Sequence, residues 1–431
     1  MSPRRIETRD RPWCDPLAVA NGLKHRDGAL ALLSDGGALG RWSFVAAEPD
    51  RVHVGPLGRD GLAILRGPDF AAGVVGLLAY DAGARVATGP REPVWPDLML
   101  ARYPAMLAFD HHQRIVRVIG RGDDPAAALA AADRADAWRE GAVEPVSPPP
   151  PAARFAPEAP PDTYRAAVAD VVARITAGEL FQANIARVWT GALNAAADPF
   201  DVMLRLADRA AAYGAFWRLG DRAIVSNSPE LFLTFDPAAA RIETRPIKGT
   251  RPRHPDPALD AALAAELQAS AKDRAENLMI VDLMRNDLSR VAEPGSVAVE
   301  RLFALESHPT VHHLVSTVAA RARPGVGPAD LLEATFPPGS ITGAPKHQAM
   351  KVIAAHEPPR GPWCGSLFHI EDDGRMTASV LIRTAAFDRA GDVWSVRAQA
   401  GAGIVADSRP EAELAETDVK ISALRTALTG V

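Results

Sequence analysis

Eight prolines lie between residues 143 and 161, and this stretch constrains the possible folds of the chain more than any other. Proline fixes φ and lacks an amide hydrogen, so the stretch cannot continue a helix or a central strand. The 431 residues suffice for two domains or for one large composite domain. We therefore predict a boundary here, with an N-terminal scaffold subdomain over residues 1–145 and a second domain over residues 160–431.

The composition argues for a cytoplasmic protein that handles small molecules. The net charge of −5 leaves no basic excess to neutralise the phosphates of a nucleic acid. Two cysteines, Cys14 and Cys364, cannot build a disulfide framework or a thiolate metal site, which fits a reducing cytosol. The charged N-terminus leads into no apolar export segment, and no run of about 18 apolar residues occurs, so no membrane anchoring is predicted.

The first 120 residues have the pattern of short strands broken by glycine, and we interpret them as scaffold. The expected strands are 29–33, 42–46, 52–54, 74–78 and 115–119, followed by an alanine-rich helix over 126–138. Beyond the prolines, the periodicity predicts a helix over 162–177 and a strand over 181–189. Gln182 and Asn184 share one face of that strand, where their amides either line a polar pocket or bond within the sheet.

A lone lysine stands among arginines and prolines in T-R-P-I-K-G-T-R-P-R-H-P-D-P, residues 244–257. Proline restricts the backbone and Gly249 permits a close approach, so the side chains here are held in place. An amine must be neutral to act as a nucleophile, and nearby cations favour the neutral form of Lys248. The available cations are Arg245, Arg251 and Arg253. A solvated basic loop is the alternative interpretation.

Acidic residues flank this stretch on both sides. Glu230 lies at a turn-to-strand junction, where it is either a general acid or an ordinary surface glutamate. A helix predicted from Ser270 to about residue 289 carries Glu276 and Asp287 on one stripe. This stripe directs two acidic groups either at a covered face or at solvent.

A glycine-rich loop, F-P-P-G-S-I-T-G-A-P-K at 336–346, precedes a helix expected over 344–355. Its free N–H groups would bind an anion, although the Gly-Lys-Ser/Thr of a Walker A loop is missing. Upstream, His308 and His312 have the i, i+4 spacing of zinc ligands. Pro309 and the lack of an H-E-x-x-H pattern argue against a zinc site.

The C-terminal pattern predicts a β-hairpin over 362–387 with its turn at 371–374. Residues 401–406 formally match G-x-G-x-x-A, but no helix opens at once and no second strand follows, which excludes a dinucleotide fold. The last helix begins near Pro410 and places Glu413, Glu416 and Lys420 on one face. These residues would hold a divalent ion and an anion together, or would form an exposed ion-pair stripe.

Together these segments resemble the chorismate-utilising family, which includes anthranilate synthase component I, aminodeoxychorismate synthase component I and isochorismate synthases. The motifs are S-P-E-L-F at 228–232, R-P-I-K-G-T at 245–250, D-R-A-E-N-L-M-I-V-D-L-M-R-N-D-L at 273–288, H-H-L-V-S at 312–316, G-S-I-T-G-A-P-K at 339–346, I-R-T at 382–384, A-G-A-G-I-V-A-D-S at 400–408 and E-L-A-E-T at 413–417. The resemblance implies a composite α+β fold of two large packed, mostly antiparallel sheets surrounded by helices. It makes residues 160–431 the chorismate-binding catalytic domain.

Within the family, P-I-K-G-T at 246–250 resembles the aminodeoxychorismate synthases, whereas anthranilate synthases usually have alanine in place of Lys248. The resemblance implies that Lys248 adds to C2 of chorismate while the C4 hydroxyl leaves, and that ammonia then enters at C4 and expels the lysine. Glu230 would protonate the departing hydroxyl. The product would lie on the way to 4-aminobenzoate and folate.

The resemblance also implies a cofactor and a set of substrate contacts. Mg²⁺ would be held by Glu276, Glu413 and Glu416, which makes sense because an oxygen-ligated cation can bridge a substrate carboxylate to protein carboxylates. The residues expected to hold the substrate carboxylates are Thr342, Gly343, Ala344, Arg383, Gly401, Gly403 and Lys420, with His313 near the ring.

In two respects the chain departs from the family pattern or leaves it incomplete. Many relatives have Gly-Tyr where this chain has Phe368-His369, so the substrate contact of the tyrosine is expected to pass to His369. The sequence has no G-x-C-x-G glutaminase elbow. Ammonia would therefore come from solution or from a separate glutamine amidotransferase subunit, and the resemblance favours the subunit. Anthranilate synthase component I is the nearest rival, and a non-catalytic chorismate-binding subunit is the alternative from another class.

Overall fold

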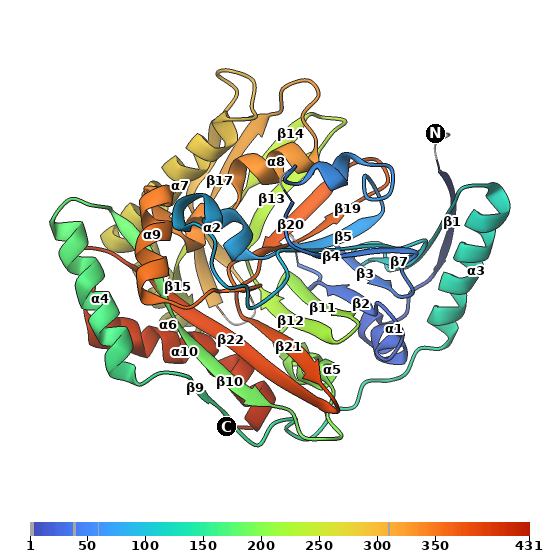
Figure 1. Ribbon diagram of the computed structural model, residues 1–431, viewed down its shortest axis with the longest axis horizontal. Coiled ribbons are helices and arrows are strands. Elements are labelled where there is room, and N and C mark those ends of the chain that lie inside the picture. The colour runs from blue at the N-terminus through green and yellow to red at the C-terminus, as the bar shows by residue number, and fades with distance from the viewer. Residues whose placement is uncertain (1–3, 38–39, 59, 309–310) are drawn as a thin grey trace.

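The computed structural model describes residues 4–37, 40–58, 60–308 and 311–431, which form two large antiparallel sheets (Figure 1). The first sheet has 12 strands, in the order β1 (Arg5–Pro12), β8 (Ile115–Gly122), β7 (Ala105–Asp110), β3 (Trp42–Ala46), β2 (Leu30–Leu33), β11 (Tyr213–Leu219), β12 (Arg222–Ser228), β21 (Thr384–Ala390), β22 (Val393–Ile404), β10 (Gln182–Ala192) and β18 (Gly343–Ala344), with β9 (Phe155–Pro157) also paired to β10. The second has 10 strands, in the order β15 (Ile247–Pro252), β17 (Val311–Arg321), β14 (Arg241–Thr244), β13 (Leu231–Asp236), β20 (Met376–Val380), β19 (Ser366–Ile370), β5 (Val74–Leu78), β6 (Leu98–Arg102) and β4 (Arg51–Gly55), with β16 (Ala298–Ser307) also paired to β17.

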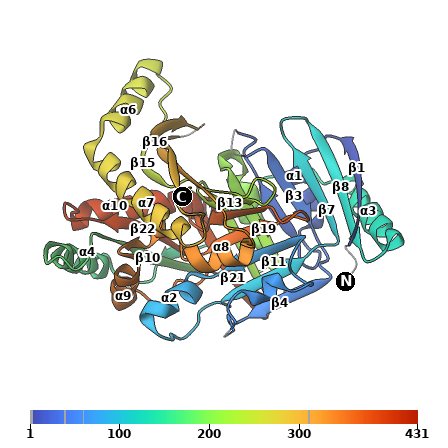
Figure 2. The ribbon, with the colours of Figure 1, turned by 90° about the horizontal axis from the view of Figure 1, so that it is seen from above.

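Helices cover the outer faces of the two packed sheets (Figures 1 and 2). Their bounds are α1 (Pro16–Leu23), α2 (Tyr80–Thr88), α3 (Pro125–Glu140), α4 (Pro161–Thr176), α5 (Pro199–Leu206), α6 (Pro257–Ala269), α7 (Ala271–Ser289), α8 (Pro328–Thr335), α9 (Lys346–His356) and α10 (Pro410–Thr429), with short 3₁₀ turns η1 (Ala63–Arg66), η2 (Ala207–Arg209) and η3 (Gly339–Ile341). This arrangement confirms the predicted α+β class with two mostly antiparallel sheets. None of the helices in the described ranges is long and apolar enough to cross a membrane.

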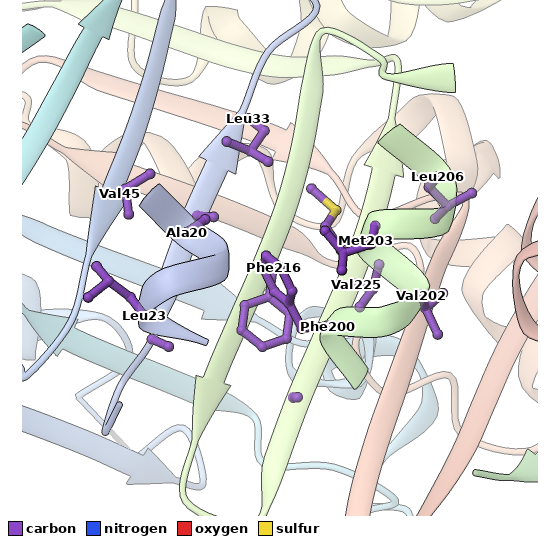
Figure 3. Packing of buried hydrophobic residues seen from close by; sticks show 14 of the residues in the cluster. Ala20, Leu23, Leu33, Val45, Phe200, Val202, Met203, Leu206, Phe216 and Val225 are labelled. Atoms are coloured by element: carbon purple, nitrogen blue, oxygen red, sulfur yellow. The ribbon is translucent and has the colours of Figure 1, made fainter. Parts of the chain in front are cut away.

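Apolar side chains fill the layer between the sheets and the layers beneath the helices. Leu77 and Leu367 of the second sheet meet Trp217 of the first in one buried cluster between the sheets. On the outer face of the first sheet, α1 and α5 pack over β2, β3, β11 and β12 (Figure 3). There the Phe200 and Phe216 rings meet edge to face with centroids 4.9 Å apart, a favoured aromatic geometry.

A repeated dipeptide explains where several helices begin. Asp-Pro stands at the start of α1, α3, α5 and α6, and in each case the aspartate side chain accepts a hydrogen bond from a backbone N–H of the first turn. The proline follows at the first helical position, where its missing N–H costs nothing and its φ already suits a helix. These four helix starts are therefore encoded by two adjacent residues each.

Strands from both sides of the proline-rich stretch contribute to both sheets. The first sheet joins β2 to β11, and the second joins β5 to β19, so residues before 145 and after 160 share hydrogen-bonded ladders. The stretch itself passes along the outside, where Phe155–Pro157 pairs with β10. The predicted scaffold subdomain and catalytic domain are thus joined by continuous sheets, and whether they fold as separate units stays a prediction.

Most sequence-predicted elements are confirmed, and two are corrected. Strands at 42–46 and 74–78 match β3 and β5, and residues 401–403 lie inside β22 rather than in a dinucleotide loop. The second strand of the predicted hairpin, over 377–387, is not continuous, because the chain leaves the second sheet after Val380 and enters the first at Thr384. The helix expected from 344 begins instead at Lys346, because Gly343 and Ala344 are extended and pair with β10.

Candidate active site

Two of the crossings of the chain between the sheets lie at neighbouring positions, and each of these two carries a charged residue. Glu230 lies between β12 and β13, and Arg383 lies between β20 and β21 with a left-handed φ of 51°. The Glu230 carbonyl accepts a hydrogen bond from the Val380 N–H (3.1 Å), and the Ser228 hydroxyl donates to the Val380 carbonyl (2.5 Å). The two crossings are therefore tied together and place a carboxyl group and a guanidinium between the sheets.

Lys248 projects from a bulge in β15. The pairing of β15 with β17 shifts register between Ile247 and Thr250, and Gly249 between them has φ of 88°. A bulge of this kind re-aims a side chain, and only glycine adopts such a φ without strain. A Cβ atom on Gly249 would also lie 2.9 Å from the Asp273 Cβ. The local sequence I-K-G-T therefore directs the Lys248 side chain away from an ordinary strand position.

The Lys248 amine lies against the backbone of β22. A Cβ atom placed on Gly403 would come within 3.1 Å of both the Lys248 Nζ and the Gln182 Nε2. A Cβ atom on Gly401 would lie 2.7 Å from the Asn184 Oδ1 and 3.1 Å from the Trp363 Cη2. The two glycines thus leave the space into which the amine, two amides and an indole ring converge.

Burial lowers the pKa of Lys248, which favours the neutral amine. The nearest charges act in both directions: Glu276 and Glu230 raise this pKa, whereas Lys420 lowers it. The predicted role of the neighbouring arginines is therefore corrected. Their charges are compensated by carboxylates, with Arg245 beside Glu306, Arg251 beside Glu266 and Asp273, and Arg253 beside Asp260.

Burial raises the pKa of Glu230 to about 7, although Ser340, Lys248, Lys420 and Arg383 act in the opposite direction. Its side chain is only 5% exposed, so the charged form is poorly solvated. Arg383 has its pKa lowered by burial and raised by Glu230. Glu230 can therefore carry a proton near neutral pH, which a general acid requires.

His313 lies on β17 beside the bulge that carries Lys248. Its Nδ1 is 2.9 Å from the Thr250 hydroxyl, and it is 3% exposed. Burial, followed by the Arg383 charge, lowers the pKa of His313 to about 3, so the ring is neutral. His312 instead contacts Asp260 and Ser307 through its two ring nitrogens.

The three predicted metal-binding glutamates approach from two helices. Glu276 of α7 and Glu413 of α10 have their pKa values raised by burial, and the Glu416 charge raises both further. For Glu416 burial acts to raise the pKa, but Lys420 at 2.7 Å lowers it overall. Lys420 also donates to the Gly401 carbonyl (2.9 Å). The carboxylates face the same region as the Lys248 amine.

These oxygen donors suit Mg²⁺ chemically, because it prefers carboxylates and rarely takes all its ligands from protein. Within the described residues, no three His, Cys, Asp or Glu side chains are already gathered closely enough to hold a metal. Burial is the largest cause of the raised pKa values of Glu276 and Glu413, so their negative charge is poorly solvated, and the Glu416 charge adds to it. A divalent cation would relieve that charge, so the residues fit the expected cofactor.

The loop over 342–344 is held tightly, but it is not the start of a helix. The Thr342 hydroxyl donates to the Pro338 carbonyl (2.8 Å), so it is already used within the loop. Gly343 has φ of 138° and lies where a Cβ would clash with the Gln182 carbonyl, while Ala344 pairs with Gln182. The first helical residue, Lys346, pairs with Asp287 at 2.6 Å. This loop therefore contributes backbone shape rather than a free helix N-terminus.

The structure places His369 on β19, where its nearest charges are Arg121 and Asp372 rather than the charged residues described above. Its ring packs edge-on against Phe44 with centroids 4.7 Å apart, between the two sheets. A contact of His369 with the substrate stays a prediction. The aromatic side chain that does reach the glycines of β22 is Trp363, which the sequence interpretation missed.

Gln182 and Asn184 emerge as further site residues. Gln182 is 0% exposed, and neither amide atom has a hydrogen-bond partner within the described chain. The Asn184 Oδ1 is likewise buried without a partner among the described residues. Buried amides normally have partners, so these atoms are available to a ligand. Of the two alternatives for these amides, the structure favours the polar pocket.

A separate cavity of about 450 Å³ lies under α1 and α5, away from the residues described above. Trp13, Leu33 and Met203 are among the side chains that line it, and it includes none of the predicted catalytic or metal-binding residues. The chemistry-bearing side chains thus converge elsewhere than at this cavity.

The family model described as chorismate binding enzyme matches residues 50–426. The chain belongs to the chorismate binding enzyme family. It is 41% identical over 366 residues to aminodeoxychorismate synthase component 1 of Klebsiella aerogenes, covering 82% of this chain and 76% of that protein. It is 37% identical over 440 residues to anthranilate synthase component 1 of Streptomyces coelicolor, covering 91% of this chain and 81% of that protein. Among solved structures it is similar to anthranilate synthase component I from Streptococcus pneumoniae TIGR4, with a TM-score of 0.77 and 26% identity. The match covers 89% of this chain and 92% of that chain.

For a chorismate binding enzyme, the charges at this site have a clear use. Arg383 and Lys420 supply positive charge, and Glu276, Glu413 and Glu416 supply carboxylates that need a cation to accept an anionic ligand. In the same region, burial favours the neutral form of the Lys248 amine and raises the pKa of Glu230 to about 7. The arrangement can therefore bind an anion, attack it and protonate a leaving group.

We predict that Gly403→Ala lowers kcat/KM about 100-fold by displacing the amine, because small misplacements at a reacting centre have effects of this size. The new Cβ meets only the ends of two flexible side chains, so the free energy of unfolding changes by less than about 1 kcal/mol. Steady-state kinetics and urea unfolding measure the two quantities. Gly58→Ala is the control, since a Cβ there meets nothing within 4 Å. Full activity in Gly403→Ala would contradict the placement of Lys248.

The raised pKa of Glu230 also predicts a pH-dependent stability. In the folded state the pKa is about 7, above its ordinary 4.5, so the stabilising effect is fully present below pH 4.5 and is lost as pH rises through 7. Glu230→Gln removes this loss. The free energy of unfolding of the variant minus that of the parent is therefore expected to increase by about 2 to 3 kcal/mol from about pH 5 to about pH 8. Urea unfolding at both pH values tests the gain, with the exposed Glu411→Gln as control. An equal difference at both pH values would show that Glu230 titrates normally.

Proposed function

We propose that this chain is component 1 of an aminodeoxychorismate synthase, which converts chorismate and ammonia to 4-amino-4-deoxychorismate. The observation that carries the proposal is the burial of the Lys248 amine against β22, among Glu230, Glu276 and Lys420. Further support comes from the relative in Klebsiella aerogenes that bears this name. In the proposed role, the product leads to 4-aminobenzoate and folate.

In the proposed reaction, the Lys248 Nζ forms a bond to C2 of chorismate, the two conjugated ring double bonds shift by one position toward C4, and the C4 hydroxyl leaves. The Glu230 carboxyl group donates the proton, so the hydroxyl departs as water. Ammonia then forms a bond at C4, the two double bonds shift back, and the C2 bond to the Lys248 ammonium breaks, so the lysine leaves as the neutral amine. The ammonium formed at C4 passes one proton to the Glu230 carboxylate, which restores the acid form of Glu230, and the pyruvyl ether is retained.

Substrate binding is assigned to the positive groups and the glycine-lined wall. Arg383 and Lys420 face the carboxylates of chorismate, and His313 lies near the ring as a neutral hydrogen-bonding group. The backbone at Gly401, Gly403 and 342–344 shapes the cavity around them. Mg²⁺, held by Glu276, Glu413 and Glu416, would supply the positive charge that a carboxylate of the substrate needs beside these glutamates.

Ammonia is proposed to come from a separate glutamine amidotransferase subunit. Support comes from the names of the relatives, which are components of larger enzymes, and from the lack of a G-x-C-x-G segment in this sequence. Anthranilate synthase component 1 remains the second candidate, because the relative in Streptomyces coelicolor shares 37% identity over 91% of this chain. That activity would place nitrogen at C2 and release pyruvate.

We predict that Lys248→Ala abolishes amination at C4, since no other amine takes its place at the bulge. The test is mass analysis of products from chorismate, ¹⁵N-ammonium and Mg²⁺. The parent is expected to give a labelled product that retains the pyruvyl group. Lys351→Ala, at an exposed lysine on α9, is expected to behave like the parent. Unchanged C4 amination in Lys248→Ala would refute the lysine step, and labelled anthranilate from the parent would favour the second candidate.

We further predict that Glu413→Gln raises the Mg²⁺ concentration for half-maximal rate by at least about tenfold, because a carboxylate oxygen is lost from the metal-binding set. Glu411→Gln is the matched control, since Glu411 lies two residues earlier on α10 and its side chain is exposed. Rates are measured in chelator-treated enzyme across a Mg²⁺ titration. Identical Mg²⁺ dependence in both variants would remove Glu413 from the metal site.

A further inference from the structure

A fully buried guanidinium lies behind the walls of the active site. Arg360 is 2% exposed and bonds to backbone groups from two separate segments. Its Nη2 donates to the Asn184 carbonyl at 2.6 Å, and its Nη1 donates to the Ile341 carbonyl at 3.2 Å. Asn184 in turn donates its N–H to the Thr342 carbonyl at 2.9 Å. One side chain thus joins β10 to the loop that precedes β18.

Glu357 completes this arrangement. Its carboxylate accepts from the Arg360 Nε (2.8 Å) and Nη2 (3.0 Å), and it also accepts from the Ala186 N–H (2.8 Å). The pair therefore satisfies both the Asn184 carbonyl and the Ala186 N–H on β10. Such a bidentate pair fixes direction as well as distance, since the guanidinium is planar.

The same guanidinium also supports a third wall. The Arg360 Cζ lies 4.8 Å from the Trp363 ring centroid and 4.5 Å from the Tyr80 ring centroid. The Trp363 ring edge is the one that approaches Gly401 of β22. In addition, the Gln399 amide of β22 donates to the Arg360 carbonyl at 2.9 Å. One ion pair therefore contacts three parts of the site wall, which are β10, the loop before β18, and Trp363 beside β22.

We infer that Arg360 and Glu357 are positioning residues, which hold β10, the 341–344 loop and Trp363 in the geometry that chorismate turnover requires. Neither side chain is among those that surround the Lys248 amine, so they act through Asn184, Thr342 and Gly401. The inference needs chorismate consumption by this site, but it does not depend on the lysine step or on where nitrogen enters.

Fold stability alone does not account for a buried pair of this kind. Replacing both members of a buried ion pair by apolar side chains of similar size often leaves stability unchanged or improved, whereas removing one member is strongly destabilising. The double variant Glu357→Leu/Arg360→Met therefore separates the two roles. It removes the side-chain hydrogen bonds to the Asn184 and Ile341 carbonyls and to the Ala186 N–H without leaving a buried charge.

We expect the double variant to stay folded at the assay temperature, with a lower unfolding temperature because two carbonyls and one N–H lose a partner, while KM for chorismate rises about tenfold and kcat falls about tenfold. A smaller folded fraction would lower kcat and leave KM unchanged, so the rise in KM marks a misplaced site. The assay follows chorismate consumption with ammonium and Mg²⁺, whichever product forms. Failure of the proposed function would change the product, whereas failure of this inference would leave KM and kcat at parental values.

The matched control is Arg121→Met/Asp372→Leu, another buried arginine that bonds to a carboxylate and to a backbone carbonyl, that of Tyr103. It is expected to keep the parental KM and kcat. Arg360→Lys serves as a second variant, since it keeps the charge beside Glu357 but cannot bond to both carbonyls, and its KM is expected to rise severalfold. Parental kinetics in the folded double variant or in Arg360→Lys, or an equal loss in the control, would overturn the inference.

Discussion

The paired crossing of the chain between its two sheets is the constraint on which the site depends. β12 and β21 are neighbours in the first sheet, and β13 and β20 are neighbours in the second, so both crossings run between the same two pairs of strands. Hydrogen bonds from Ser228 and Val380 tie them together. A carboxyl group and a guanidinium placed at these crossings cannot move apart without breaking both sheets, which is why Glu230 and Arg383 form a fixed pair of functional groups.

The charge state of the Lys248 amine reflects opposing effects, and burial is the largest of them. Three glutamates pull the pKa of Lys248 upward, and the Lys420 charge pulls it downward together with burial. The positive residues that stand closest in sequence are already neutralised by their own carboxylates. Because a cation at the glutamates would remove part of their attraction for a proton on the lysine, metal binding and amine neutrality favour each other.

The sequence predicts local structure well where the signal is local. Short apolar segments define β3 and β5 at both ends, and the family motifs point to Lys248, Glu230 and the glutamates, which the fold brings together. The prediction of a continuous strand through Arg383 fails, because a left-handed φ at a non-glycine residue leaves no mark in the sequence. The neighbours of His369 are equally invisible in the sequence, because the Phe44 ring and the Arg121 and Asp372 charges reach it only through the packing of the two sheets.

The arginines beside Lys248 show why electrostatics is the hardest property to predict from a sequence. Their partner carboxylates come from α6, α7 and β16, which are distant in the chain or separated by turns. Likewise, the buried amide of Gln182 is exceptional only because no partner for it exists within the described chain, a property of the packed structure. The sequence motif therefore identified the proposed nucleophile but not the groups that set its charge.

The N-terminal half contributes none of the proposed catalytic or metal-binding side chains, yet the chemistry of the site relies on it. Its strand β2 extends the first sheet beyond β11, and its strand β5 extends the second beyond β19. Without these neighbours the strands that carry the crossings would lie much nearer to the sheet edges, where water reaches the interior. The shift in the pKa of Glu230 arises mainly from burial, so solvation of this region would return the group toward its ordinary acidity. The scaffold thus acts on the reaction by keeping a carboxyl group out of water.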